Sequence, residues 1–119
     1  MRRIVLMFVS TALAMVLLAS GVALAKSLAG TDGADMLVGT RQADTIHAGA
    51  GDDVVRGGAG NDQIYGEDGT DRLRGGKGND RIYSGGLFKD EIDCGPGKKD
   101  WAEVDASDTV VNCERLERV

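Results

Sequence analysis

Aspartate residues recur at a fixed spacing of nine along the middle of the chain, each two positions before a large aliphatic residue. From Gly30 onwards the sequence divides into six units of nine residues, with the aspartate at the sixth place of each unit. These residues are Asp35, Asp44, Asp53, Asp62, Asp71 and Asp80. Carboxylates that repeat beside glycine-rich turns are suited to holding cations, because such turns also offer backbone carbonyl oxygens.

The array continues in two longer units. Residues 84–93 and 94–103 each run ten residues and place Asp90 and Asp100 one position late, so we interpret them as degenerate copies. An aspartate in a glycine-rich turn often bonds its own backbone, which would explain a single such turn. Six aspartates in register favour a ligand role instead. Aspartates outside the sixth place, such as Asp68, are interpreted as turn residues.

Each unit predicts a turn followed by a short strand. The glycine-rich half permits positive φ, and the second half has residues typical of strands. Two units, or 18 residues, would then form one coil with the eighth-place aliphatic side chains inside. The two internal columns are predicted to contain Leu37, Val55, Leu73 and Ile92 in one and Ile46, Ile64 and Ile82 in the other.

The units fit the pattern G-G-x-G-x-D-x-U-x, with U a large aliphatic residue, and residues 57–65 and 75–83 match it at every place. On these residues the chain resembles the haemolysin-type (RTX) calcium-binding repeat family over roughly residues 30–103. The resemblance implies an all-β fold, a right-handed parallel β-roll with two nonapeptide units per coil. It also implies Ca²⁺ ions between loops two units apart.

Paired loops are therefore expected to share ions. The resemblance favours Asp53 with Asp71 and Asp62 with Asp80, followed by Asp35 with Asp53. Unit two departs most from the pattern, because Thr40 and Gln42 replace glycines, and its Asp44 loop is the weaker candidate. The predicted metal ligands are Asp35, Asp44, Asp53, Asp62, Asp71, Asp80, Asp90 and Asp100.

Calcium suits these ligands better than other metals. It accepts six to eight oxygen ligands in a loosely constrained geometry, whereas Mg²⁺ demands tighter octahedral coordination. Zinc and copper prefer histidine or cysteine, and the repeats contain a single histidine, His47. Stacked carboxylates about 4.8 Å apart would repel by about 1 to 3 kcal/mol per neighbour. Several calcium ions are therefore expected, and their binding and folding should be one event.

Residues 1–25 have the pattern of a Sec signal peptide. Arg2 and Arg3 supply positive charge, an apolar run follows, and residues 23–25 form an A-x-A cleavage site. An uncleaved membrane anchor is the alternative, because residues 4–25 are long enough to span a bilayer. The small residues at the cleavage site favour removal and secretion to the extracellular space.

Composition sets further limits on partners. The net charge is −5 and becomes −7 after cleavage, because residues 1–25 contain two of the cationic side chains and none of the acidic ones. Such a chain is not expected to bind nucleic acid or, once cleaved, a membrane. Glycine is abundant, with 18 residues of 119, which alone would suggest disorder. The periodicity indicates a folded repeat protein instead, expected to be a monomer.

Two cysteines in an exported protein predict one disulfide, Cys94–Cys113. This pair cannot make a zinc site of normal ligand number. We expect a roll over residues 26–93 and a degenerate last repeat with a C-terminal cap over residues 94–119. The cap is expected to cover the open end of the roll, with Trp101 packed there and the disulfide holding it.

The outward-facing ninth places carry His47, Tyr65 and Tyr83 in one column. This column resembles a glycan-stacking strip, but the strand propensity of an exposed face explains it more simply, so we expect it to be functionally silent. No nucleophile motif is present, and a thin roll offers no deep pocket, so we expect no enzyme activity. The alternative function is a calcium-scaffolded adhesin or glycan-binding module with a cell-surface glycan or protein as partner.

Overall fold

The structure is a computed structural model that describes residues 26–119; the predicted signal peptide, residues 1–25, lies outside the described residues. The described residues form short strands joined by turns. The strands are β1 (Ser27–Ala29), β2 (Met36–Val38), β3 (Thr45–His47), β4 (Val54–Arg56), β5 (Gln63–Tyr65), β6 (Arg72–Arg74), β7 (Arg81–Tyr83), β8 (Glu91–Asp93), β9 (Trp101–Val104), β10 (Thr109–Val111) and β11 (Arg115–Arg118). This part of the chain has no helix that could cross a membrane.

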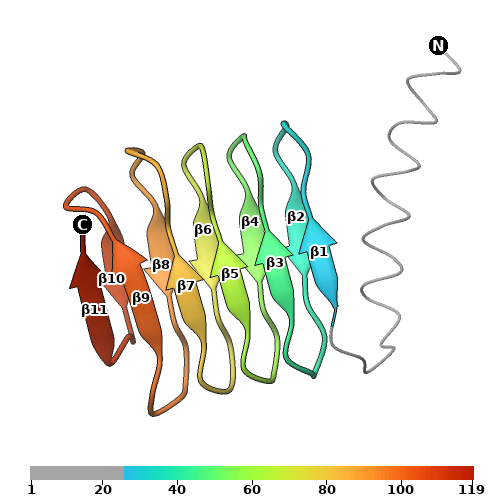
Figure 1. Cartoon of the computed structure of the whole chain (residues 1–119), viewed down its shortest axis with the longest axis vertical. Helices are drawn as coiled ribbons and strands as arrows, with labels where there is room; N and C mark the ends of the chain where they lie inside the picture. The colour runs from blue at the N-terminus through green and yellow to red at the C-terminus, as the bar shows by residue number, and fades with distance from the viewer. Residues whose placement is uncertain (1–25) are drawn as a thin grey trace, which may run out of the picture.

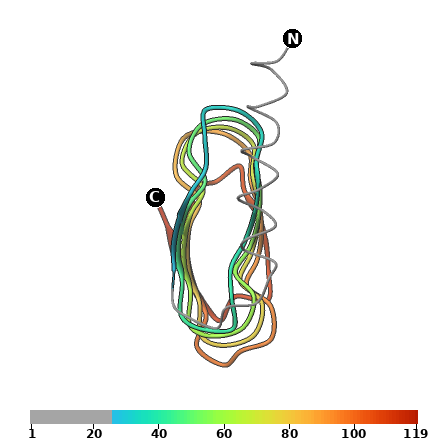
Figure 2. The same cartoon turned by 90° about the vertical axis from the view of Figure 1, so that its right-hand side faces the viewer.

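Successive strands alternate between two parallel sheets (Figure 1). One sheet has the order β1-β3-β5-β7-β9-β11 and the other β2-β4-β6-β8-β10. Leu37 pairs with Val55, and Ile46 with Ile64, so each coil advances the chain by 18 residues. An end-on view shows the coils superimposed as a flattened ring of two facing sheets joined by turns (Figure 2). The predicted all-β parallel roll with two units per coil is confirmed.

The core is a thin double column between the sheets. The central residue of each three-residue strand from β2 to β8 points inward and is buried, because successive side chains of a strand point to opposite faces. The two predicted aliphatic columns are therefore confirmed. The fully buried aliphatic members of these columns are Ile46, Val55, Ile64, Leu73, Ile82 and Ile92.

The two long units keep the register of the roll. Ile92 pairs with Leu73, and Ala102 pairs with Ile82, so the loops before β8 and β9 contain the additional residues. Hydrogen bonds from Asp71 N–H to Asp90 and from Asp80 N–H to Asp100 place both late aspartates in line with the earlier ones. The degenerate units are therefore full members of the coil.

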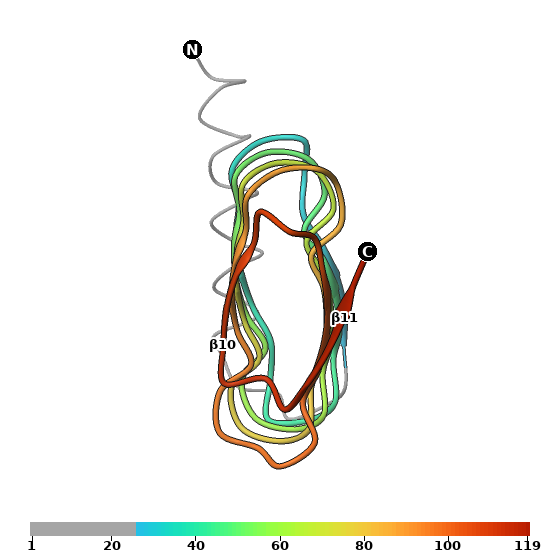
Figure 3. The ribbon, with the colours of Figure 1, turned by 90° about the vertical axis from the view of Figure 1, so that its left-hand side faces the viewer.

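Both ends of the roll are built from coils that the repeat pattern did not predict. At the N-terminal end, β1 is the first strand of the six-stranded sheet, and its Leu28 pairs with Ile46. At the C-terminal end, β10 and β11 add one further strand to each sheet (Figure 3). The segment after Val104 thus continues the roll beside β8 and β9 as another coil, with Val110 paired to Ile92 and Leu116 to Ala102.

The predicted disulfide Cys94–Cys113 is confirmed, with a Cα–Cα distance of 5.1 Å. It joins the loop after β8 to the loop before β11. The expected position of Trp101 was wrong. Its side chain lies on the outer face of β9 beside Tyr83, because the small Ala102 takes the inward place of this strand.

Candidate metal sites

Buried aspartates form two columns, one along each edge of the roll. Within residues 26–119 the buried carboxylates are Asp35, Asp44, Asp53, Asp62, Asp71, Asp80, Asp90, Asp100 and Asp108. From Asp53 to Asp100, one oxygen of each carboxylate, Oδ1, accepts the backbone N–H of the aspartate one coil earlier at 2.7 to 2.9 Å. The stacking of the eight predicted aspartates follows their spacing, whereas their role as metal ligands stays a prediction.

The second oxygen, Oδ2, of the middle carboxylates has no protein partner. Within the described residues, buried Oδ2 atoms without a hydrogen bond belong to Asp53, Asp62, Asp71, Asp80, Asp90 and Asp100. A buried polar atom without a partner is costly and rare in a native protein. Six of them in two columns indicate that another group, such as a cation, satisfies these oxygens.

Backbone carbonyl oxygens lie beside the unpaired oxygens. An added Cβ on Gly57 would lie 2.5 Å from Asp62 Oδ2 and 2.6 Å from the Gly75 carbonyl oxygen. On Gly75 it would lie 2.5 Å from Asp80 Oδ2 and 2.7 Å from the Cys94 carbonyl oxygen. Glycine at the first place therefore leaves room for oxygen atoms from two successive coils to approach the same small space.

The first two units satisfy their carboxylates internally. Thr31 N–H donates to Asp35 Oδ2 at 2.5 Å, and its hydroxyl group lies 3.0 Å from both carboxylate oxygens. Thr40 makes the same contacts with Asp44, and its N–H lies 2.6 Å from Oδ2. These two loops therefore resemble each other and differ from the six that follow.

The turn conformation explains the difference. In the six later units the second place has positive φ; these residues are Gly49, Gly58, Glu67, Gly76, Gly85 and Gly95. The non-glycine residues with positive φ in the described chain are Glu67 and Asn112, so Thr31 and Thr40 keep ordinary φ. A threonine at the second place is thus the sequence signal for a loop that satisfies its own carboxylate, and of the two such loops only that of Thr40 was predicted to be weaker.

A ninth carboxylate, Asp108, closes one column. Its Oδ1 accepts the N–H of Asp90 at 2.9 Å, and its Oδ2 accepts the Ser84 hydroxyl at 2.8 Å and the Asp105 N–H at 2.9 Å. Asp108 was not among the predicted residues of the column, although it follows Asp90 by 18 positions. Because both oxygens are paired, Asp108 ends the column without needing a cation.

Burial raises the pKa of the unpaired carboxyl groups. Desolvation is the largest cause and raises the pKa of Asp62 from 3.8 to about 8 and that of Asp71 from 3.8 to about 7. The pKa values of Asp80 and Asp90 also rise to about 7, and that of Asp53 to about 6. The N–H bond at Oδ1 lowers each pKa, while neighbouring carboxylates raise it. An adjacent cation would favour the ionised form again.

Each site would depend on main-chain ligands. Within residues 26–119 no three histidine, cysteine or acidic side chains gather in one place that could hold a metal ion. A carboxylate oxygen beside a backbone carbonyl oxygen is a hard-oxygen set, which fits calcium rather than zinc or copper. The coil and its oxygen-lined loops thus define a repeat protein whose ligand atoms suit hard cations.

Comparison with known proteins agrees with this class. A family model described as the RTX calcium-binding nonapeptide repeat (4 copies) matches residues 29–64 and 65–86. This repeat region belongs to the family of RTX calcium-binding repeats, and the chain is a Ca²⁺-binding repeat protein. No curated protein and no solved structure gave a significant match.

Proposed function

We propose that the chain is exported and that calcium bound between its stacked loops drives its folding outside the cell. The observation that carries this proposal is the set of six buried Oδ2 atoms without a protein partner. An unliganded roll would bury these groups uncompensated. Bound calcium would supply the positive charge that keeps them ionised and the coordination that satisfies their oxygens.

We assign the calcium ligands by this criterion. The primary carboxylate ligands are Asp53, Asp62, Asp71, Asp80, Asp90 and Asp100, each supported by an unpaired Oδ2. Asp35 and Asp44 would bind more weakly, because an ion must first displace the N–H and hydroxyl of Thr31 or Thr40. The late register of Asp90 and Asp100 does not weaken them as candidates, since both stack in line.

Export is supported by two independent features. Residues 1–25 have the signal-peptide pattern, and the Cys94–Cys113 disulfide is typical of oxidising compartments. Extracellular calcium modules bind at roughly 0.1 to 1 mM, so the chain would stay unfolded at cytosolic calcium and fold after export. We propose a binding role without catalysis.

A calcium titration of the exported protein, followed by circular dichroism, tests this function. We expect an unfolded spectrum in EDTA and a cooperative gain of strand signal as calcium is added, because ions that bind only the folded form stabilise it by mass action. Magnesium at equal concentration is the matched control and should give a much smaller change. A strand spectrum that EDTA leaves unchanged would contradict the proposal.

A calcium-scaffolded glycan-binding module is the second candidate. One observation favours it: aromatic rings line the outer face of the six-stranded sheet. In this case calcium would still fold the roll, and the function would lie on its surface.

A further inference from the structure

A row of aromatic rings crosses the outer face of the six-stranded sheet and ends at Trp101. The ring centres of His47 and Tyr65 lie 4.5 Å apart, and those of Tyr65 and Tyr83 lie 4.6 Å apart, with both pairs parallel to within 3°. The Tyr83 and Trp101 centres lie 5.0 Å apart, but their planes meet at 64°. The row is thus a parallel stack that changes orientation at its last member.

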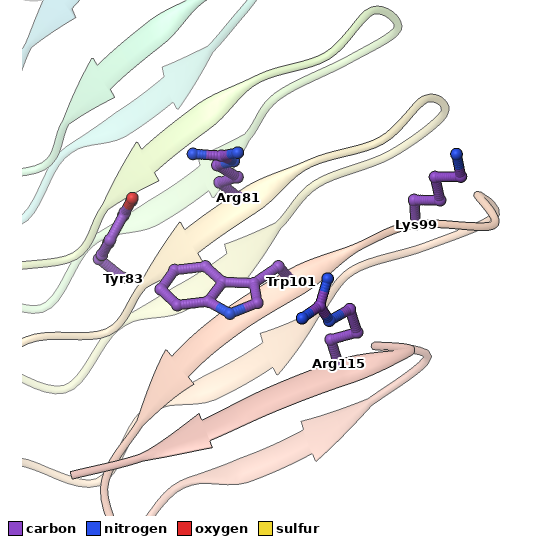
Figure 4. A pocket seen from close by; sticks show the side chains of 5 residues that line it. All are labelled: Arg81, Tyr83, Lys99, Trp101 and Arg115. Atoms are coloured by element: carbon purple, nitrogen blue, oxygen red, sulfur yellow. The ribbon is translucent and has the colours of Figure 1, made fainter.

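The change of orientation decides which ring can receive a ligand. Parallel rings cover each other's faces, so Tyr65 has a neighbour on both sides and is not available for stacking on a ligand. Trp101 breaks the stack, and its indole ring lies across the sheet surface between Arg81 and Arg115 (Figure 4). Its face is therefore a stacking surface next to cationic side chains.

Cationic side chains surround this ring in an open groove of about 680 Å³, lined by Arg81, Tyr83, Lys99, Trp101 and Arg115. A volume of this size lies within the range of small-ligand sites. The parallel register places Arg81 and Arg115 on the two strands that flank Trp101, β7 and β11. Lys99 lies in the loop that leads into β9.

Within the described part of the chain, none of these three cationic side chains forms an ion pair. The close contacts between basic and acidic side chains in residues 26–119 are His47–Glu67 and Arg72–Glu91, and neither reaches the groove. The acids on the outer face of these strands, Glu103 and Glu117, continue the row of Tyr83 rather than that of Trp101. A positive cluster without acidic partners on a chain of net charge −5 points to a ligand that carries negative charge.

We propose that this groove binds an acidic saccharide, in which a sugar ring that bears a carboxylate lies on the Trp101 indole. The apolar face of the sugar would pack on the indole, and its carboxylate would accept hydrogen bonds from Arg81, Arg115 and Lys99. Guanidinium groups match a carboxylate through paired N–H donors. The flat indole face distinguishes a sugar from a bare anion, which needs no stacking surface.

The proposal rests on the proposed function only in that the roll must be folded for Arg81, Trp101 and Arg115 to meet. Titration calorimetry of the exported protein in saturating calcium, with trigalacturonic acid as the probe, tests it. A titration of the same sugar into protein-free calcium buffer removes the contribution of calcium binding to the uronate. The fully methyl-esterified trimer is the neutral control with the same rings.

We expect the acid to bind at least about tenfold more tightly than its ester, since hydrogen bonds to charged groups are the strong ones. Trp101→Ala, Arg115→Gln and Lys99→Gln should each weaken the binding by about fivefold or more. Lys99 lies in an exposed loop, so its variant tests the groove without a risk to folding. Arg74→Gln, which removes the same charge from the opposite sheet, should leave the affinity unchanged.

Several results would overturn the proposal. One is no uronate binding by a protein whose circular dichroism shows the folded roll, and another is equal binding of acid and ester. Equal losses in Arg74→Gln and Arg115→Gln would show a general charge effect. Competition by inorganic phosphate that Trp101→Ala does not change would show an anion site without a saccharide. Uronate binding that persists in EDTA would contradict calcium-driven folding but would still support the groove as the saccharide site.

Discussion

Replacing Asp71 by asparagine separates the metal-binding role of this carboxylate from its structural hydrogen bond. Oδ1 of Asp71 accepts the Asp53 N–H at 2.8 Å, and the asparagine side chain keeps that acceptor. Oδ2 has no partner and lies on the same side of Gly66 as the Ser84 carbonyl oxygen. The new amide group carries no charge that folding must bury, so the calcium-free roll should not be weakened.

The substitution Asp71→Asn should instead lower the affinity for calcium. A carboxylate oxygen about 2.4 Å from a divalent ion is attracted to it by about 3 kcal/mol even at the dielectric constant of water. This loss corresponds to about a hundredfold in affinity, and the smaller desolvation cost of the neutral amide offsets part of it. We therefore expect the calcium midpoint of folding to rise by about tenfold or more, with a lower cooperativity.

The assay is circular dichroism over a calcium titration, with calorimetry to count the ions. Asp68→Asn is the matched control, because Asp68 is exposed in the same unit and its substitution removes the same charge. Its midpoint should change little. Equal shifts in Asp68→Asn and Asp71→Asn would refute the assignment of the sixth-place carboxylates as ligands.

Three further outcomes are expected. Without calcium, the raised pKa values of Asp53, Asp62 and Asp71, about 6 to 8 against 3.8, mean that the folded form holds more protons than the unfolded form. The stability that these groups contribute to the roll is therefore complete below about pH 4 and is lost as the pH rises through 6 to 8. Acidification of the calcium-free protein should therefore increase the strand signal in circular dichroism. A decrease would contradict the burial of these groups. Cys113→Ser removes a cross-link that contributes about 3 kcal/mol, so the melting temperature in calcium should fall by roughly 10 to 20 °C. The number of bound ions measured by calorimetry should not change. Free thiols in the exported wild type would show that the disulfide is absent. Tyr65→Ser, within the parallel ring stack, should leave both the calcium midpoint and uronate binding unchanged in the same titrations, and a loss of uronate binding would mean that the stacked rings contact the ligand.

The sequence predicted the parts of the fold that depend on one interval. A period of nine residues with two units per coil makes residues 18 positions apart neighbours, as the pairing of Leu37 with Val55 shows. The aliphatic columns, the carboxylate columns and the row of His47, Tyr65 and Tyr83 all follow from that interval. The ten-residue units could also be placed, because each has its own aspartate and, in one case, its own aliphatic residue, Ile92.

The ends of the roll were harder to predict. Only part of the unit remains at β1 and β10, where Leu28 and Val110 take the aliphatic place without the glycines before them. The glycine-rich half is the stronger sequence signal, so the repeat pattern begins only at Gly30, and residues 94–119 are predicted as a degenerate repeat and a cap. Pairing to the neighbouring coil supplies the strand geometry that the local sequence does not specify.

By itself the sequence determined the period, the inward and outward faces and the stacking of carboxylates, because each is a property of single places in a regular repeat. Tertiary structure decided which carboxylates remain unpaired, since this depends on the φ angle at the second place and on the N–H that Thr31 or Thr40 turns towards its aspartate. It also decided the groove around Trp101. Its neighbours Arg81 and Arg115 lie 20 and 14 residues away in the chain, intervals that the period does not contain and that only the paired strands bring together.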